Sequence, residues 1–278
     1  MTASGNVTSA LIFDQRARLL LVSLTGPAAT LCTRHQLRGQ AAQHAAAGLV
    51  ATGLLSAHIK GEERLTLFVR SEEPDFTFTA DWDADGSVRG LLKPREIPDE
   101  PLFTGQLSVV KSLGRRELYR GNSEVILEDF EAALQRYFVS SEQVDGRIRI
   151  QTTLSAAGEL TGAFGLLVER LPDWNAEEFG RAIEPLLTTP LAELVPGIQA
   201  GRLGEQPITV MESREVEFRC SCSRARVEAT LVALGPEELT LILEDPGFAE
   251  VTCEYCSEIY HLDAAALKQL IAPGSAQV

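Results

Sequence analysis

"RLTLFVRSEEPDFTFTADWDADGSVRGLLKP" spans residues 64–94, and its side chains alternate between apolar and polar. Segments 64–70 and 75–83 alternate as half-buried strands do, because successive strand side chains point to opposite faces of a sheet. Between strand-like flanks, "DWDADGS" (81–87) favours a polar hairpin turn over a calcium loop, whose twelfth position needs a bidentate Glu and is Leu92 here. We therefore predict adjacent strands joined by tight turns.

The strand pattern continues on both sides of this stretch. Further strands are predicted at 87–94, 105–113, 146–154 and 162–171, and two more lie within 10–24 around a polar turn. An alanine-rich helix is predicted at 37–59, and an amphipathic helix at 123–144, where apolar residues recur at steps of three and four: Leu127, Phe130, Leu134 and Phe138. Strands in runs with helices segregated between them predict an α+β domain over residues 1–175, with a mainly antiparallel sheet and packed helices.

The sequence pattern changes at residue 172. Segment 172–207 contains five prolines and short helical pieces without a long periodic element. We predict a metastable helical linker over residues 176–217, with strand character resuming at 208. Its apolar side chains need burial, and the sheet of the first domain is the expected cover: Phe179, Ile183, Leu186, Leu187, Leu191, Leu194 and Val195.

Residues 218–278 are predicted to form a small C-terminal domain. Val227, Leu231 and Leu234 share one helix face that ends at Gly235-Pro236, and a second helix follows. "EVTCEYCSEIYHL" (250–262) is typical of a strand–turn–strand, and Asp263 is placed to cap a last helix. A domain of about sixty residues with so few large apolar side chains is marginally stable unless disulfides or a bound metal ion cross-link it.

Composition and charge exclude several classes of protein. Hydrophobic residues make up 45% and charged residues 23% of the 278 residues, which argues for a folded chain. The net charge is -14, and residues 176–278 hold 17 of the 39 acidic side chains but only 7 of the 25 basic ones. This argues against nucleic-acid and anionic-membrane partners, which need a basic face. No apolar run of membrane-spanning length and no signal-peptide pattern is seen, so we expect a cytoplasmic protein.

Four of the five cysteines lie in the C-terminal domain. Cys220 and Cys222 form a Cys-x-Cys pair, and Cys253 and Cys256 form a Cys-x-x-Cys pair between strand-like flanks. Because tetrahedral zinc accepts four thiolates and cytosolic thiols stay reduced, the two pairs predict one four-cysteine Zn2+ site. His261 is a spare candidate ligand that four cysteines make unnecessary, and Cys32 has no assigned role.

The residues leave two uses of such a site open. A structural zinc would only fold the tail, since the free energy of metal binding can serve as folding free energy. A redox use is favoured by the closeness of Cys220 to Cys222 and by Arg219, Arg224 and Arg226, because nearby cations favour the thiolate that oxidants attack. The sequence shows no P-loop and no catalytic constellation, so neither ATP-driven action nor an enzyme is expected.

The C-terminal pattern resembles the redox module of the heat-shock chaperone family of 33 kilodaltons. The resemblance rests on Cys-x-Cys and Cys-x-x-Cys at 220–256, and it extends through "GLVATGLLSAHIKGEERLTLFVRSEEP", "LEDFEAALQRYFVSSEQV" and "AFGLLVERLP" in the family's order. The one departure is "RSEEPDF" (70–76), which lacks the glycine-rich turn usual in the family. This difference concerns a local loop and not the resemblance as a whole.

The resemblance implies a redox-regulated, ATP-independent holdase. In that family, the four cysteines hold zinc in the inactive reduced state. Oxidative stress then forms disulfides between neighbours, here Cys220 with Cys222 and Cys253 with Cys256; zinc leaves and apolar surface for unfolding client proteins is exposed. Dimerisation on activation is also implied. The alternative is a zinc-ribbon interaction or nucleic-acid-binding scaffold with a purely structural zinc.

Overall fold

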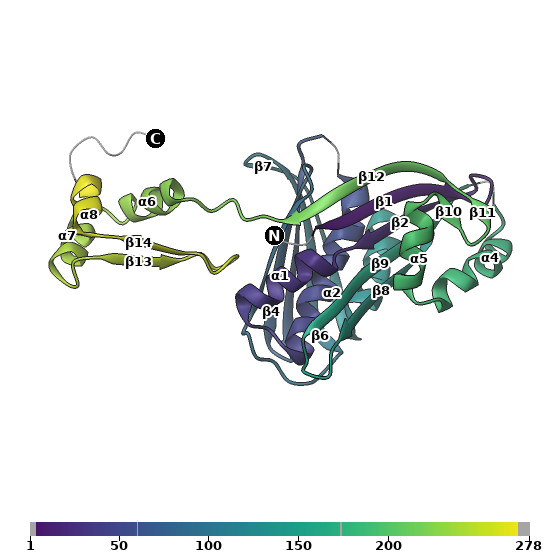
Figure 1. Cartoon of the computed structure of the whole chain (residues 1–278), viewed down its shortest axis with the longest axis horizontal. Coiled ribbons are helices and arrows are strands. Elements are labelled where there is room, and N and C mark those ends of the chain that lie inside the picture. Colours follow the sequence, from purple (N-terminus) through teal and green to yellow (C-terminus); the bar gives the residue numbers. More distant parts are fainter. Residues whose placement is uncertain (1–3, 60, 173, 272–278) are drawn as a thin grey trace. The chain divides into compact units, whose positions relative to one another are not determined.

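The computed structural model describes residues 4–59, 61–172 and 174–271, and it has the α+β class that the sequence predicts. The chain divides into two compact units, Met1–Arg219 and Cys220–Val278, which we describe separately (Figure 1). The division falls two residues after the expected boundary at 217/218. Residues 176–217, expected as a separate linker, lie within unit 1. Among the described residues, no helix is both long and apolar enough to cross a membrane.

A sheet of ten strands forms the body of unit 1 within the described ranges. The strand order is β7-β6-β3-β4-β5-β12-β1-β2-β9-β8. Neighbours pair antiparallel, as predicted, except for a short parallel contact in which Glu217 and Phe218 of β12 pair with Ser87 and Val88 of β5. The strands are β1 (Gly5–Ile12), β2 (Ala17–Ser23), β3 (Arg64–Glu73), β4 (Phe76–Asp83), β5 (Ser87–Lys93), β6 (Phe103–Leu113), β7 (Arg116–Glu128), β8 (Gly146–Leu154), β9 (Leu160–Arg170) and β12 (Thr209–Phe218).

The acidic stretch at 81–87 forms the predicted hairpin turn. Gly86 adopts a positive φ of 84°, a backbone conformation that glycine tolerates without strain. The carboxylate of Asp85 accepts the N–H of Ser87 at 2.8 Å. Asp81 and Asp83 instead form ion pairs across the sheet, with Arg89 and Arg64 respectively. These carboxylates are therefore used in strand pairing.

Helices α1 (Thr25–His35), α2 (Gly39–Leu55) and α3 (Phe130–Tyr137) pack on the sheet, and the short helix η1 (Ser56–His58) follows α2 and contacts it. The predicted alanine-rich helix is α2, and small residues let it approach the strands closely. A Cβ on Gly165 of β9 would lie 2.5 Å from Cγ1 of Val50, and a Cβ on Gly48 would lie 2.4 Å from the Phe78 ring. The helix and the sheet thus approach each other closely at these glycines, which have no side chain.

The predicted helix over 123–144 is wrong in its first part. Residues up to Glu128 continue strand β7, and the helix begins only at Phe130, where the carboxylate of Asp129 accepts the N–H of Ala132. Leu127, expected on the helix face, is 67% exposed and has a φ of 51°. β-Branched Val125 and Ile126 favour the strand, and an N-cap aspartate defines the start of the helix. The helix then continues as a π-helix, η2 (Phe138–Glu142).

Segment 176–208 forms two helices and a small hairpin: α4 (Ala176–Thr188), α5 (Leu191–Gln199), β10 (Arg202–Leu203) and β11 (Gln206–Pro207). Leu19, Leu21 and Val168 of the sheet pack with the apolar side chains of α4 and α5, whereas Val22 and Gly165 approach α2. Because strand side chains alternate, α4 and α5 cover the face of β2 and β9 opposite to α2.

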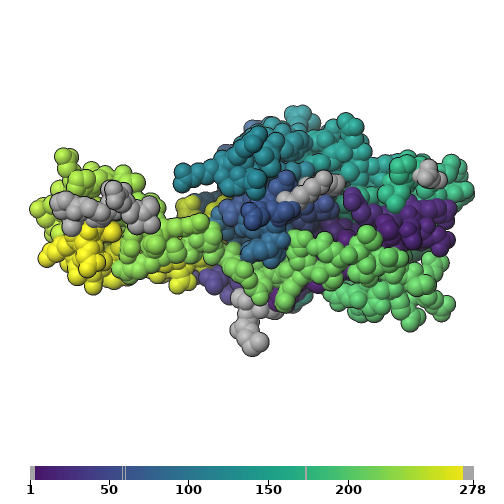
Figure 2. Space-filling view, turned by 90° about the horizontal axis from the view of Figure 1, so that it is seen from above, coloured from purple at the N-terminus to yellow at the C-terminus, as the bar shows by residue number. Residues whose placement is uncertain are grey.

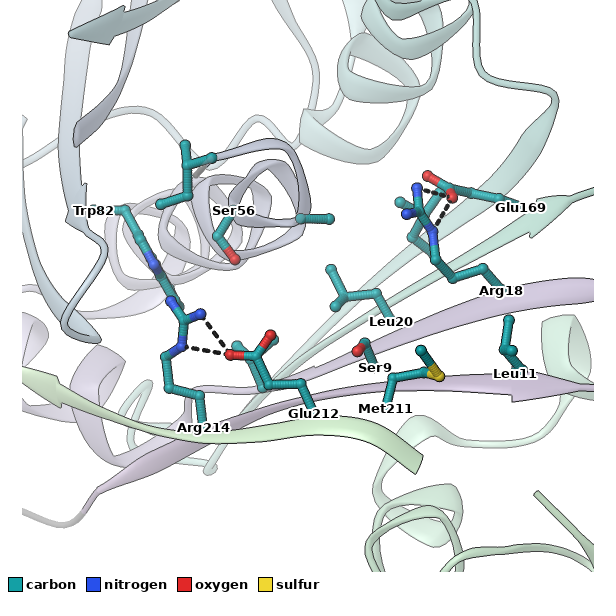
Figure 3. A pocket seen from close by; sticks show the side chains of 14 residues that line it. Ser9, Leu11, Arg18, Leu20, Ser56, Trp82, Glu169, Met211, Glu212 and Arg214 are labelled. Atoms are coloured by element: carbon teal, nitrogen blue, oxygen red, sulfur yellow. Dashed lines mark hydrogen bonds and ion pairs between the residues drawn. The ribbon is translucent and has the colours of Figure 1, made fainter. Parts of the chain in front are cut away.

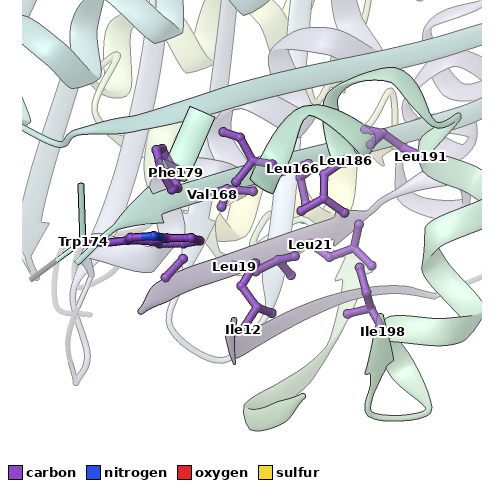
Figure 4. Close-up of a cluster of buried hydrophobic side chains, with 12 residues drawn as sticks. Ile12, Leu19, Leu21, Leu166, Val168, Trp174, Phe179, Leu186, Leu191 and Ile198 are labelled. Atoms are coloured by element: carbon purple, nitrogen blue, oxygen red, sulfur yellow. The ribbon is translucent and has the colours of Figure 1, made fainter. Parts of the chain in front are cut away.

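This interface buries the linker residues that were expected to need cover (Figure 4). Phe179, Ile183, Leu186 and Leu191 are at most 4% exposed, and Leu187, Leu194 and Val195 pack at its margin. The strand that follows, β12, lies on the surface of unit 1 beside the N-terminal strand β1, with which it pairs (Figure 2).

Unit 2 contains α6 (Arg224–Val232), α7 (Pro236–Glu244), the hairpin β13 (Ala249–Thr252) and β14 (Ile259–Leu262), and α8 (Ala264–Ile271). Asp263 caps α8 as predicted, accepting the N–H of Ala266 at 2.9 Å. Among the described residues up to 271, the core of this unit is small and has six buried residues: Val227, Leu231, Leu239, Ala249, Leu262 and Leu267. A core of this size gives limited stability by itself.

Candidate metal and redox site

The four cysteines of unit 2 converge from two short segments. Cys220 and Cys222 lie in the extended residues between β12 and α6, whereas Cys253 and Cys256 lie in the turn between β13 and β14. Two backbone hydrogen bonds close that turn: the N–H of Cys253 donates to Glu258 and the N–H of Ser257 donates to Cys253, each at 2.8 Å. The hairpin thus fixes the second pair, and the chain entering α6 brings the first pair to it.

The sulfur atoms are arranged as four ligands of one ion would be. All four Sγ atoms lie within 4.8 Å of one another. Cys222 and Cys256 are 3.3 Å apart, and Cys220 and Cys253 are 3.7 Å apart. A tetrahedral zinc with Zn–S bonds of about 2.3 Å requires sulfur separations of about 3.8 Å. The donor set and its spacing therefore fit Zn2+.

Burial controls the protonation of these thiols in the absence of a cation. It raises the pKa of Cys222 and of Cys256 above the ordinary thiol range, and nearby Cys220 raises both further. Four sulfurs so close together cannot all carry a negative charge unless a cation compensates them. A divalent ion among them would provide that compensation.

The arginines expected to favour thiolates make other contacts. Arg219 pairs with Glu217 and Asp85. Arg224 pairs with Glu228 and donates to the carbonyl of His261, and Arg226 donates to the hydroxyl of Ser221. With the pKa of two thiols raised by burial, the expectation that arginine charge activates these cysteines is not supported.

One residue at the site was missed by the sequence analysis. The hydroxyl of Tyr260 donates a hydrogen bond to Sγ of Cys222 at 3.1 Å. Tyr260 is in β14, two residues before buried Leu262, so strand alternation places both side chains on the same face. That alternation is a signal by which Tyr260 could have been found.

The other candidates lie elsewhere. His261 is in β14, and its ring packs against Phe248 with centroids 5.2 Å apart. Cys32 is buried in α1, where its thiol contacts the carbonyl of Ala42 at 3.8 Å and burial raises its pKa to about 12. Cys32 is thus a packed core residue of unit 1.

Unit 1 also has a cavity of about 380 Å³ between η1 and strands β1, β2, β4, β9 and β12 (Figure 3). Its apolar lining includes Leu20 and Trp82. Its charged groups pair with each other, Arg18 with Glu169 and Arg214 with Glu212. The charged groups that line the cavity are thus used in ion pairs, which does not define a reaction centre.

Comparison with known proteins identifies the family of the chain. The model of the Hsp33 protein family matches residues 5–263, so the chain belongs to the Hsp33 family. A 33 kDa chaperonin of Citrifermentans bemidjiense is 32% identical over 92% of each chain, and one of a Geobacillus species is 28% identical over 96% of this chain and 97% of its own.

The fold has a counterpart among solved structures. The crystal structure of the 33 kDa chaperonin, a heat shock protein 33 homologue, from Thermotoga maritima matches with a TM-score of 0.82 over 96% of this chain and 97% of its own, at 22% identity. Family membership supports a chaperone function, and the relatives are named as chaperonins rather than as enzymes.

Proposed function

We propose that this protein is a redox-regulated, ATP-independent holdase that binds unfolding proteins in the cytoplasm under oxidative stress and is not an enzyme. The observation that carries the proposal is the convergence of four thiols within 4.8 Å in a chain of the Hsp33 family. The acidic balance, with a net charge of -14, fits protein clients better than nucleic acid or an anionic membrane.

In the reduced state, we propose that Cys220, Cys222, Cys253 and Cys256 hold one Zn2+. When bound, zinc would supply the positive charge that makes four neighbouring thiolates compatible. The ligands come from two separate segments of unit 2, one before α6 and one between β13 and β14. Because the apolar core formed by the described residues of this unit is small, ligation would supply much of its stability.

Oxidation would remove these ligands. Each pair of thiolates gives up two electrons and forms one disulfide, while one peroxide takes up two electrons and two protons and becomes two waters. We propose the pairs Cys220 with Cys222 and Cys253 with Cys256, following the family resemblance. The sulfur positions alone leave the pairing open, since all four atoms lie within 4.8 Å. Thiols consumed in this way no longer bind the metal.

Loss of the ligands would destabilise unit 2 and then the linker. α4 and α5 contain Pro185 and Pro196 and are held mainly by their apolar face against the sheet. Their release would expose the sheet residues beneath them, an apolar surface suited to unfolding clients: Ile12, Leu19, Leu21, Leu166 and Val168. Exposure of such a surface is also the basis on which we propose dimerisation on activation.

The variant Cys220→Ser tests this proposal, with Cys32→Ser as the control that removes a thiol outside the cluster. We expect Cys220→Ser to bind zinc more weakly and to suppress client aggregation partly without oxidant, whereas Cys32→Ser should behave as the parent protein. A Cys220→Ser protein that keeps tight zinc and is inert in the aggregation assay would contradict the coupling between metal site and client binding.

A further inference from the structure

The connection between the two linker helices is capped from within the linker only in part, by the hydroxyl of Thr188, which donates to the carbonyls of Glu184 and Pro185. α4 has no basic residue in its last turn, and its final residues are followed by Thr189 and Pro190. α5 begins after Pro190, whose side chain makes no capping hydrogen bond. The last carbonyls of a helix and the first N–H groups of the next need partners, and a short turn containing proline offers few.

Strand β8 supplies partners for both helix ends. Nη1 of Arg149 donates to the carbonyl of Leu186 at 3.0 Å and to the carbonyl of Thr189 at 2.6 Å. Oε1 of Gln151 accepts the N–H of Leu191 at 2.7 Å. A cation at the carboxyl end of α4 also complements the helix dipole. Arg149 and Gln151 are two residues apart on one strand, so they lie on the same face of the sheet.

The strand that carries these two residues is itself anchored. β8 is at the edge of the sheet, and its backbone N–H groups at Ile148 and Ile150 donate to Gln135 and Glu131 of α3 at 2.9 and 2.6 Å. Helix α3 therefore occupies hydrogen-bonding positions of β8 that an edge strand leaves open. Arg149 and Gln151 thus project from a strand that is fixed on both sides.

We propose that Arg149 and Gln151 form a latch that sets how readily the linker leaves the sheet. The sheet supplies three of the hydrogen bonds at these two helix ends, so undocking would cost α4 and α5 these bonds together with their apolar burial. Docking and helix formation of the linker are coupled for this reason, and release is cooperative. The effect of the latch on chaperone activity rests on the proposed function, in which release of the linker exposes the client-binding surface.

The test compares Arg149→Ala with Arg147→Ala in the reduced, zinc-loaded full-length protein. Arg147 is the matched control: it is on the same strand and face, carries the same charge, and donates to its own neighbour Gly146. Amide hydrogen exchange of peptides from 176–199 is the readout. We expect exchange to rise roughly tenfold to a hundredfold in Arg149→Ala, the range that corresponds to a hydrogen bond from a charged group, and to stay unchanged in Arg147→Ala.

Two variants of Gln151 test the latch without removing the charge of Arg149. Gln151→Leu loses the acceptor for Leu191, and its linker should exchange roughly threefold to tenfold faster. Gln151→Glu keeps an acceptor and adds a negative charge at a helix N-terminus, so exchange should be equal to or slower than in the parent. The comparison of Gln151→Leu with Gln151→Glu tests the latch even if Arg149→Ala fails to fold.

The outcomes separate the latch from the proposed function. Equal exchange at 176–199 in Arg149→Ala and Arg147→Ala, or in Gln151→Leu and Gln151→Glu, overturns the latch. Faster exchange together with suppression of client aggregation before oxidation supports both. Faster exchange without such suppression supports the latch and contradicts the proposal that linker release exposes the client surface.

Discussion

Replacing Ile183 by alanine should loosen the linker of the reduced protein while leaving the four cysteines intact. Ile183 is the centre of the apolar face of α4 and is 1% exposed against the sheet. Truncating a buried isoleucine to alanine costs about 2–5 kcal/mol, because both the transfer free energy and the packing around the cavity are lost. Even about 2 kcal/mol corresponds to roughly a thirtyfold shift in an opening equilibrium.

That shift acts on the linker interface because Ile183 is in α4 and its neighbours are the sheet residues beneath it. We expect hydrogen exchange at 176–199 to accelerate by at least about thirtyfold, and we expect aggregation of a thermally unfolding client to be suppressed without peroxide. Zinc content should equal that of the parent, since unit 2 is unchanged. The control is Glu184→Ala, an exposed residue of the same helix, which should alter neither readout.

Unchanged exchange in Ile183→Ala would show that burial of this helix face does not hold the linker. Accelerated exchange with no suppression of aggregation would refute the reasoning that the surface under the linker binds clients.

Three further predictions concern Cys32, Tyr260 and His44, a residue of α2 that is buried in unit 1. Because burial raises the pKa of Cys32 to about 12, this thiol should remain unmodified when the native protein is treated with peroxide and mapped by mass spectrometry; its oxidation together with the other four would contradict the burial argument. Tyr260→Phe removes the hydrogen bond to Cys222, and zinc affinity measured by competition with a chelator should fall by about tenfold or more; equal affinity would show that the hydroxyl does not support the ligand. Burial lowers the pKa of His44 from 6.5 to about 4, so the unfolded chain binds the proton first as pH falls through this window, and the free energy of unfolding should drop by up to about 3 kcal/mol between pH 6.5 and 4. His44→Phe should show a correspondingly smaller drop in urea unfolding, and an identical pH dependence would rule out His44 as the source.

Local periodicity was enough to predict much of the fold. Alternation identified the strands at 64–83, and small residues identified α2, because both signals come from residues adjacent in sequence. Helix α1 was missed because Gly26 and Pro27 are helix breakers in most positions; both lie in its first turn, where a proline needs no hydrogen-bond partner. The start of α3 was misplaced because Leu127 happens to fit the helical spacing while belonging to β7.

The sequence was enough to predict which cysteines form the candidate site, but not their burial, their protonation or their contacts. Spacing predicted that Cys220, Cys222, Cys253 and Cys256 would converge, and the structure brings their sulfurs together. The protonation of these thiols depends on burial, which no local pattern shows. Contacts such as that of Tyr260 with Cys222, separated by 38 residues, and of Arg149 with Thr189, separated by 40, exist only after the chain has folded.

The central claim is that thiol oxidation at the four-cysteine site turns on client binding. The most direct measurement follows zinc release and suppression of client aggregation in one sample, before and after peroxide at mildly raised temperature, and again after a dithiol reductant with added zinc. The account predicts that zinc release and chaperone activity rise together and that both are reversed on reduction. Zinc release without any gain in suppression would contradict it, and would leave the cluster as the structural zinc site of an interaction or nucleic-acid-binding scaffold.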